Sequence, residues 1–270
     1  LLSSIGIKNY SIVLREANII LFPDDGLIKK FKTIVMLNVF YRFSDAIICN
    51  CIHASASLAK IVVFSKVPIS TLANPVVPEE YFNDEFVKHI HLKRERGGIL
   101  CVSRHNRQKD IAILLRAFSN LLQKSPNAKL TIVGEGPLLA ANKSLARELN
   151  ISKSVVFIDR VHPLNEMYLK YETFVLPSKW EGTPNSMVEA LVSGMKVVSF
   201  EALGCAAELV RVGNGNVAAE RNELDLAKAL EASLDSDFPC QMLRLKSLRQ
   251  FQASVATDQF VKLYAQIRCV

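Results

Sequence analysis

From Gly97 onward the sequence alternates short apolar runs with amphipathic segments long enough to form helices. The runs are "GILCVS", "KLTIVG", "SVVFI", "TFVLP" and "KVVSF". Nearly continuous apolar runs of this length are typical of strands buried on both faces, and helical connections between them predict parallel pairing. The pattern therefore predicts an α/β fold in which helices cover both faces of a parallel sheet.

The upstream part of the chain is less regular and predicts a second, smaller unit. Two strands are expected within "SIVLR" and "SDAIICN", at residues 11–15 and 45–50, with a helix between them. Asn74-Pro75 and Pro78 then interrupt regular structure, because the residue before a proline is biased away from the helical conformation. A charged stretch follows without a clear strand, which predicts a domain boundary near residue 76.

These breaks divide the chain into three parts. We expect a partial N-terminal unit at 1–76, a C-terminal unit at 77–250, and a terminal helix at 251–270 that returns to the N-terminal unit. The sequence begins without Met, in the middle of a fold-like pattern and without a signal peptide. We therefore expect a fragment whose N-terminal unit is incomplete.

Charge and cysteine content narrow the class of protein. The 33 Lys and Arg residues against 26 Asp and Glu give a net charge of +7, which favours an anionic ligand or surface. Nucleic acid is disfavoured because no aromatic-basic motif occurs. The dispersed cysteines predict reduced thiols in a cytoplasmic protein, and Cys49-x-Cys51 has the wrong spacing for the usual zinc or redox pairs. His89-x-His91 is expected in a solvated linker, so no metal site is predicted.

The segment "FKTIVMLNVFYRF" (31–43) is the best candidate for peripheral membrane contact. Lys29, Lys30, Lys32 and Arg42 surround its apolar residues, as in helices that lie on anionic bilayers. A packed helix with a basic rim is the alternative. No run of about 18 uncharged apolar residues predicts a membrane span.

The segment "SKWEGTPNSMVEALVSGMKVV" (178–198) carries two carboxylates between two predicted strands. Thr183 is expected to cap a helix whose first residue is Pro184, and Gly194 suits its end. Asn185, Ser186, Glu189 and Ser193 recur every three or four residues, so they form one polar stripe. Glu181 precedes the helix at the edge where parallel sheets bind ligands. The spacing predicts a crevice lined by Glu181, Glu189 and the helix N-terminus.

Three other turns follow predicted strands at the same edge. Arg104 and Lys109 lie before a helix that Asp110 is expected to cap, and a guanidinium with an ammonium suits a diphosphate. Gly134-x-Gly136 permits a close backbone approach but lacks the third glycine of the dinucleotide motif, which disfavours an oxidoreductase. "FEALGCAAELV" (200–210) is consistent with a turn and helix on the same rim.

The order of these motifs resembles the C-terminal domain of retaining GT-B glycosyltransferases of family 4. The likeness is carried by Arg104 and Lys109, "GEGP" (134–137) and "EGTPNSMVEA" (181–190), and it covers most of 97–215. Upstream, "SDAIICN" and "NPV" are similar to the end of the family's N-terminal domain and its linker. The resemblance implies two Rossmann-like domains and transfer of a sugar from a nucleotide-diphosphate donor with retention, without a metal or other cofactor.

The resemblance also assigns roles to single residues. Arg104 and Lys109 would bind the donor diphosphate of UDP or GDP type, Glu189 the ribose hydroxyls, and Glu181 the transferred sugar. The sites implied for donor binding also include Gly134, Gly136, Arg160, Val161, Asn185, Ser186 and Met187, with Arg160 and Val161 near the base. The acceptor implied is saccharide or lipid-linked, in the synthesis of surface polysaccharide or another glycoconjugate.

The sequence departs from the family pattern at three positions. Ser103 and His105 replace the usual glycine and apolar residue on either side of Arg104, and Asp159 replaces a glycine near the expected base pocket. Arg15 and Glu16 are expected near the cleft. Alternatives left open are a sugar-nucleotide epimerase, a phosphorylase of similar architecture, and a non-catalytic protein that binds sugar nucleotides.

Overall fold

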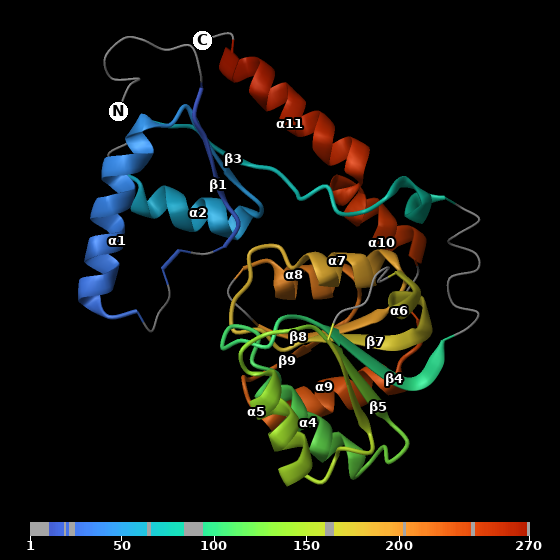
Figure 1. The fold of residues 1–270 in the computed structure, drawn as a ribbon. Helices are drawn as coiled ribbons and strands as arrows, with labels where there is room; N and C mark the ends of the chain where they lie inside the picture. The colour runs from blue at the N-terminus through green and yellow to red at the C-terminus, as the bar shows by residue number, and fades with distance from the viewer. Residues whose placement is uncertain are drawn as a thin grey trace.

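The computed structural model describes residues 11–18, 20–21, 25–63, 66–83, 94–159, 165–201, 204–238 and 241–268. Within them lie two parallel sheets, one of three strands and one of six, each with its own helices (Figure 1). The α/β class and parallel pairing predicted from the apolar runs are confirmed.

The larger sheet forms the C-terminal unit and has the strand order β6-β5-β4-β7-β8-β9. Every pairing is parallel, and the order reverses between β4 and β7. Its strands are β4 (Glu95–Val102), β5 (Lys129–Val133), β6 (Val155–Ile158), β7 (Tyr171–Leu176), β8 (Lys196–Phe200) and β9 (Asn216–Ala218). Such a reversal creates a crevice at the carboxyl ends of the central strands, where ligands of open α/β sheets bind.

Helices cover both faces of this sheet because alternate residues of its strands are buried on opposite sides. Leu100 of β4 belongs to one apolar cluster, whereas its neighbours Ile99 and Cys101 belong to the other. One face packs against α7 (Asn185–Val192), α8 (Ala206–Val212) and α10 (Gln241–Leu248), with α6 (Asn165–Lys170) on the same side. The other face packs against α4 (Ile111–Leu122), α5 (Leu139–Glu148) and α9 (Glu223–Asp235).

The smaller sheet has the order β1-β2-β3, with all strands parallel. Its elements are β1 (Val13–Glu16), α1 (Leu27–Phe40), a 3-10 turn at Tyr41–Phe43, β2 (Ala46–Cys49), α2 (Ile52–Ile61) and β3 (Ile69–Thr71). Its core is formed by β2, α2 and part of α1, and among the helix residues of α1 only Leu37 and Asn38 are buried.

The link between the two units runs beside the start of the last helix. After a 3-10 turn at Glu79–Phe82 the chain enters the larger sheet, and a second 3-10 turn at Arg249–Phe251 precedes α11 (Ala253–Arg268). Val77 donates its N–H to Phe251 O at 3.0 Å and accepts from Ala253 N at 2.9 Å. Figure 1 shows α11 running from this point toward the side where the smaller sheet lies.

Two three-residue strands were not predicted. The strand β3 lies in the segment expected to lead into a linker, and β9 lies beyond the last apolar run. Both are short edge strands whose pairing depends on a neighbouring strand already in place, and their sequences carry no apolar run.

No helix among the described residues is both long enough and apolar enough to cross a bilayer.

Candidate functional site

The loop after β7 and the first turn of α7 bring the two predicted carboxylates to the carboxyl edge of the sheet. Glu181 is buried in the loop, and Glu189 lies one turn into the helix with part of its side chain exposed. Gly194 ends the helix with φ +77, as the sequence predicts. The expected cap is wrong: Pro184 is the N-cap residue, and the Thr183 hydroxyl instead donates to Asn50 O at 2.7 Å in the smaller unit.

Most of the amphipathic pattern of α7 is confirmed. Met187, Val188, Leu191 and Val192 are buried in the core, while Asn185 is exposed. Met187 thus offers a candidate ligand only its backbone N–H, which already lies 3.0 Å from Pro184 O. Ser193 was placed on the polar stripe but is fully buried, because the helix ends there against Arg94, which donates to its carbonyl oxygen.

Glu189 is held by a tyrosine that the sequence did not single out. Tyr168 of α6 is buried and donates its hydroxyl to Glu189 Oε2 at 2.7 Å. Burial raises the pKa of the Glu189 carboxyl, and the Tyr168 hydrogen bond opposes part of that rise. The remaining carboxylate oxygen is an acceptor for a ligand hydroxyl.

Lys109 and Glu181, from different loops, lie in direct contact. Lys109 Nζ is 2.5 Å from Glu181 Oε1, and the side chains are only 18% and 5% exposed. A weakly hydrated pair of this kind is a place where an ammonium can reach a phosphate while the carboxylate accepts a sugar hydroxyl. Arg104 is exposed and forms no ion pair with any described residue, so its guanidinium is available to an anion.

Asp110 does not cap the following helix, contrary to expectation. It takes a left-handed conformation with φ 46, and its side chain makes no capping hydrogen bond. Its carboxylate instead accepts from Arg221 Nη2 at 2.7 Å, which fixes the loop that carries Lys109 against the start of α9. The Asp110 carboxylate thus pairs with Arg221 and does not cap the backbone N–H groups of α4.

Gly134 and Gly136 interlock with the loop that carries Arg104. A Cβ at Gly134 would lie 2.1 Å from Ser103 O, and one at Gly136 would lie 2.5 Å from His105 O. Both glycines have positive φ, near +150°, so a side chain is excluded by conformation and by space. The two glycines therefore allow their own backbone to pack closely against the loop that carries Arg104.

His105 fills the apolar position on which the sequence departs from the family. It is fully buried, with Nδ1 2.9 Å from Asn142 Nδ2 and its ring 5.9 Å from that of Phe157. Burial lowers the pKa of the imidazole, which favours the neutral form. His105 therefore acts as a core residue beneath the Arg104 loop.

The smaller unit contacts this edge directly. A Cβ on Gly182 would lie 2.0 Å from Ala17 O, and Gly182 N donates to Asn18 Oδ1 at 3.2 Å. Arg15 Nη2 donates to Asn74 Oδ1 at 2.6 Å, and Asn74 Nδ2 donates to Asn185 Oδ1 at 2.6 Å. The expectation that Arg15 lies near the cleft is thus met through a polar relay to the first residue of α7.

Several other predicted residues lie outside the described residues or bond groups that were not expected. Arg160, Val161, His89 and His91 lie outside the described residues. Glu16 accepts a hydrogen bond from the Tyr41 hydroxyl. Asp159 is exposed, 3.9 Å from Lys143.

Known proteins share the sequence family and the fold of this chain. Residues 83–249, more than half of the chain, match the family described as glycosyl transferases group 1. This chain belongs to that family.

Relatives of this group 1 glycosyltransferase include an uncharacterized glycosyltransferase of Methanocaldococcus jannaschii, 29% identical over 194 residues, or 66% of this chain and 44% of that protein. The N-acetylgalactosamine-N,N'-diacetylbacillosaminyl-diphospho-undecaprenol 4-alpha-N-acetylgalactosaminyltransferase of Campylobacter jejuni is 27% identical over 214 residues, or 79% of this chain and 56% of that one. The chain spans about half the length of the curated relatives it matches.

The group 1 glycosyltransferase also has the fold of solved relatives. A TarM variant of S. aureus, crystallised with fondaparinux, alpha-GlcNAc-glycerol and UDP, superposes with a TM-score of 0.74 at 18% identity, covering 96% of this chain and 51% of that one. The architecture is GT-B, as the motifs predicted.

A pocket among the described residues lies away from these motifs. It has a volume of about 490 Å³ and is lined by the amino ends of β4 and β7 and by the residues after α9, among them Arg94, Gly97, Glu172 and Phe238. Arg94 donates to three backbone carbonyls there, and burial lowers its pKa to about 10. This pocket therefore lies at the opposite edge of the sheet from the candidate site, whereas ligands of open parallel sheets bind at the carboxyl ends.

Sequence reasoning missed the partners that come from other elements. Tyr168, Asn18, Asn50 and Asn74 each bond a predicted site residue or its neighbour. None of them lies in a spaced motif, but Asn50 ends "SDAIICN" and Asn74 begins "NPV", the two upstream segments that resemble the family.

Proposed function

We propose that this chain is the donor-binding part of a retaining glycosyltransferase of family 4. It would transfer a sugar from a nucleotide-diphosphate donor to a saccharide or lipid-linked acceptor, in the synthesis of polysaccharide or another glycoconjugate. The observation that carries the proposal is the contact of Lys109 with Glu181 beside the N-terminus of α7, the helix that also holds Glu189. A cation, a buried carboxylate and a second carboxylate then line one edge of the sheet.

The donor would lie across this edge with its charged groups in complementary surroundings. Lys109 and Arg104 would bind the diphosphate and neutralise the charge that grows on the leaving group as the glycosidic bond breaks. Glu181 would accept hydroxyls of the transferred sugar, and the free N–H groups at Asn185 and Ser186 would add donors at the start of the helix. Glu189, fixed by Tyr168, would accept the ribose hydroxyls.

The arrangement supports transfer on one face of the sugar without a metal. The acceptor oxygen would attack the anomeric carbon from the side on which the diphosphate departs, and its proton would pass to a phosphate oxygen of the leaving group. Glu181 is ion-paired with Lys109, which makes it a poorer nucleophile and favours this route over an enzyme-bound intermediate. The two basic side chains would supply the charge that a metal ion supplies in other transferases.

A lipid-linked acceptor agrees with the surface of α1. Leu27, Ile28 and Phe31 are 85%, 74% and 69% exposed, and Lys29, Lys30 and Lys32 lie among them. An apolar stripe with a basic rim suits the headgroup region of an anionic bilayer. Contact at this helix would keep the chain near a lipid-linked acceptor. The Campylobacter jejuni relative is named for a diphospho-undecaprenol substrate.

Calorimetric titration of UDP, GDP and their common sugar conjugates tests the donor site. We expect binding that weakens by about 1–3 kcal/mol in Glu189→Ala, because a charged hydrogen-bond acceptor is lost. Glu148→Ala, on the exposed side of α5, should bind as the unaltered chain does. Equal affinity in all three proteins would overturn the assignment of Glu189. Binding without turnover would favour a non-catalytic sugar-nucleotide-binding role instead.

A further inference from the structure

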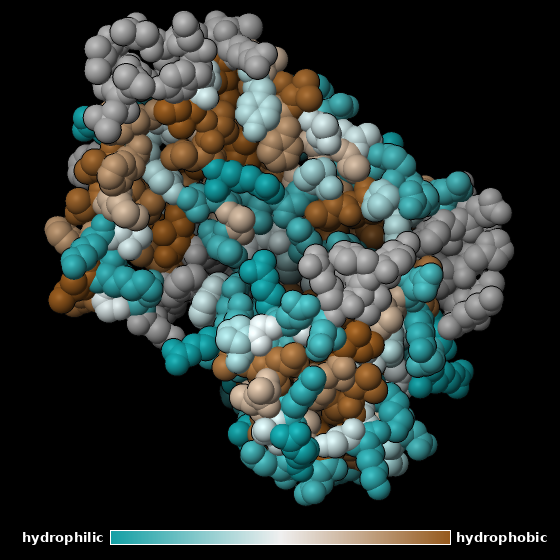
Figure 2. Space-filling model, viewed as in Figure 1, coloured by the Kyte–Doolittle hydropathy of each residue, from teal (hydrophilic) through white to brown (hydrophobic). Residues whose placement is uncertain are grey.

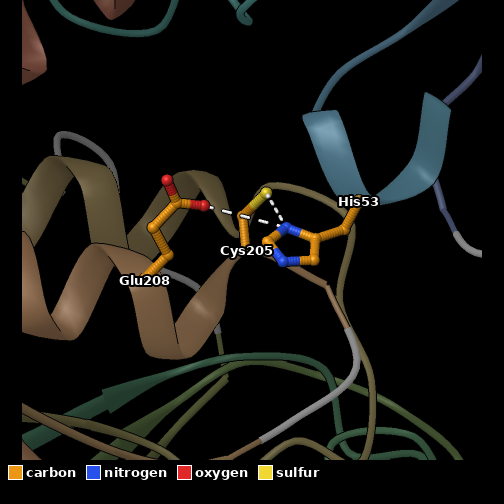
Figure 3. Close-up of side chains that lie close together, drawn as sticks. All are labelled: His53, Cys205 and Glu208. Carbon is orange, nitrogen blue, oxygen red and sulfur yellow. Dashed lines mark hydrogen bonds and ion pairs between the residues drawn. The ribbon is translucent and has the colours of Figure 1, made fainter. Parts of the chain in front are cut away.

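Three potential metal ligands from the two units meet beside the site. His53 comes from the first turn of α2, and Cys205 and Glu208 lie at the start of α8 (Figure 3). His53 Nδ1 is 3.5 Å from Cys205 Sγ and 3.7 Å from Glu208 Oε2, and the three ligand atoms all lie within 4.8 Å of one another. Figure 3 shows the side chains pointing toward one another across the junction of the units.

These separations fit one small ion. Zinc–ligand bonds of roughly 2.0–2.3 Å in a tetrahedral arrangement place neighbouring ligand atoms about 3.3–3.8 Å apart. The two distances that involve His53 fall in that range without any movement. His53 and Glu208 have side chains 51% and 56% exposed, so an ion can reach them from solvent, whereas Cys205 is buried behind them.

The ligand types also select among ions. A thiolate with an imidazole favours zinc over magnesium or calcium, which prefer oxygen ligands. One thiolate and one carboxylate together balance the charge of a divalent cation. We propose that His53 Nδ1, Cys205 Sγ and a Glu208 carboxylate oxygen bind Zn²⁺, with a water in the fourth position.

The site would fasten the two units together next to the donor edge. Cys205 N donates to Gly182 O at 3.2 Å, and a Cβ on Gly204 would lie 1.6 Å from Glu181 O, so the ligand loop packs on the loop of Glu181. An ion that binds only when His53 meets Cys205 and Glu208 stabilises that arrangement by mass action. This role is independent of sugar transfer and of the ligands bound at Glu189.

Metal competition with a chromogenic chelator tests the site in the whole chain. The protein, kept reduced and stripped of metal, should take up one tight equivalent of Zn²⁺. His53→Ala and Glu208→Gln should each lower the affinity for Zn²⁺ by at least roughly tenfold. Loss of a residue that only supports a ligand already costs about that much, so loss of a ligand should cost no less. Glu201→Gln is the matched control, since Glu201 is an exposed carboxylate paired with Arg211. Its affinity should equal that of the unaltered chain.

Cobalt substitution identifies the sulfur ligand independently. Co²⁺ bound at this site should show a thiolate-to-metal charge-transfer band that Cys205→Ser removes. His53→Ala and Glu208→Gln alter exposed side chains, so they keep the test valid even if Cys205→Ser does not fold. A tight equivalent that persists in both of those variants, or the absence of any tight equivalent, would overturn the proposal.

Discussion

Burial raises the pKa of the Glu189 carboxyl, so binding at the proposed donor site is expected to depend on pH. The pKa of its carboxyl is raised by burial, so protonation begins at a higher pH than for an ordinary glutamate. We expect nucleotide affinity to fall as the pH drops through this raised pKa, because the protonated group is a poorer acceptor. Titration of UDP over a pH series would measure it, and Glu189→Gln should abolish that part of the dependence. Matching pH profiles in the two proteins would contradict the role.

The same residue affects folding with the opposite sign. A carboxyl whose pKa is higher in the folded state binds protons more tightly there than in the unfolded chain. Its contribution therefore favours folding at low pH and is lost as the pH rises through the folded pKa. Acid thus stabilises this group while it weakens the donor site.

The positions of single residues could be predicted where the local sequence has a helical repeat or a helix-end signal. Glu181, Glu189 and Gly194 follow from helix periodicity and end signals, and all three occupy the expected parts of the loop and helix. Thr183 and Asp110 were wrong as caps because partners distant in sequence, Asn50 and Arg221, bind their side chains. Such competition cannot be read from a local pattern.

The loop between β7 and α7 depends on a glycine for its contact with the smaller unit. We expect Gly182→Ala to destabilise the protein by about 1–3 kcal/mol, the cost of overpacking, since the new Cβ would meet Ala17 O at 2.0 Å. Urea unfolding would measure the loss, and limited proteolysis after β1 would report the loosened contact.

Gly26→Ala is the control for this substitution. A Cβ added at Gly26 would have nothing within 4 Å, and its φ of −61 is one that alanine adopts freely. An unchanged Gly182→Ala protein would show that the two units do not pack there in solution.

Elements were predicted well where apolar runs are long and poorly where strands are short. The five runs after Gly97 all became strands of the larger sheet, with helices on both faces. The strands β3 and β9 were missed because three residues hold too little apolar surface to stand out, and neighbouring strands define them instead.

Most of the exposed large apolar side chains among the described residues belong to the smaller unit. Figure 2 shows brown side chains gathered on that side, where α1 lies in Figure 1. We expect the chain to float with liposomes that contain anionic lipid, and Phe31→Ser with Ile28→Ser to reduce the bound fraction severalfold. Val156→Ser, which removes an exposed apolar side chain from the larger unit, is the control. Equal flotation with neutral lipid would show that the basic residues do not contribute to membrane binding.

The arrangement of the two units was the part least accessible from sequence. Motif order implied two Rossmann-like domains, but the contacts of Asn18, Asn50 and Asn74 with the larger unit join residues more than one hundred positions apart. Polar side chains in loops carry no periodic signal, so their partners emerge only when both sheets are folded.

The bridge between Val77 and the residues around Gln252 limits how the units can move. The chain leaves the smaller unit at Val77 and begins α11 at Ala253, and backbone hydrogen bonds tie these two passages together. These bonds hold the two segments side by side, so any relative rotation of the two units is expected to turn about this point.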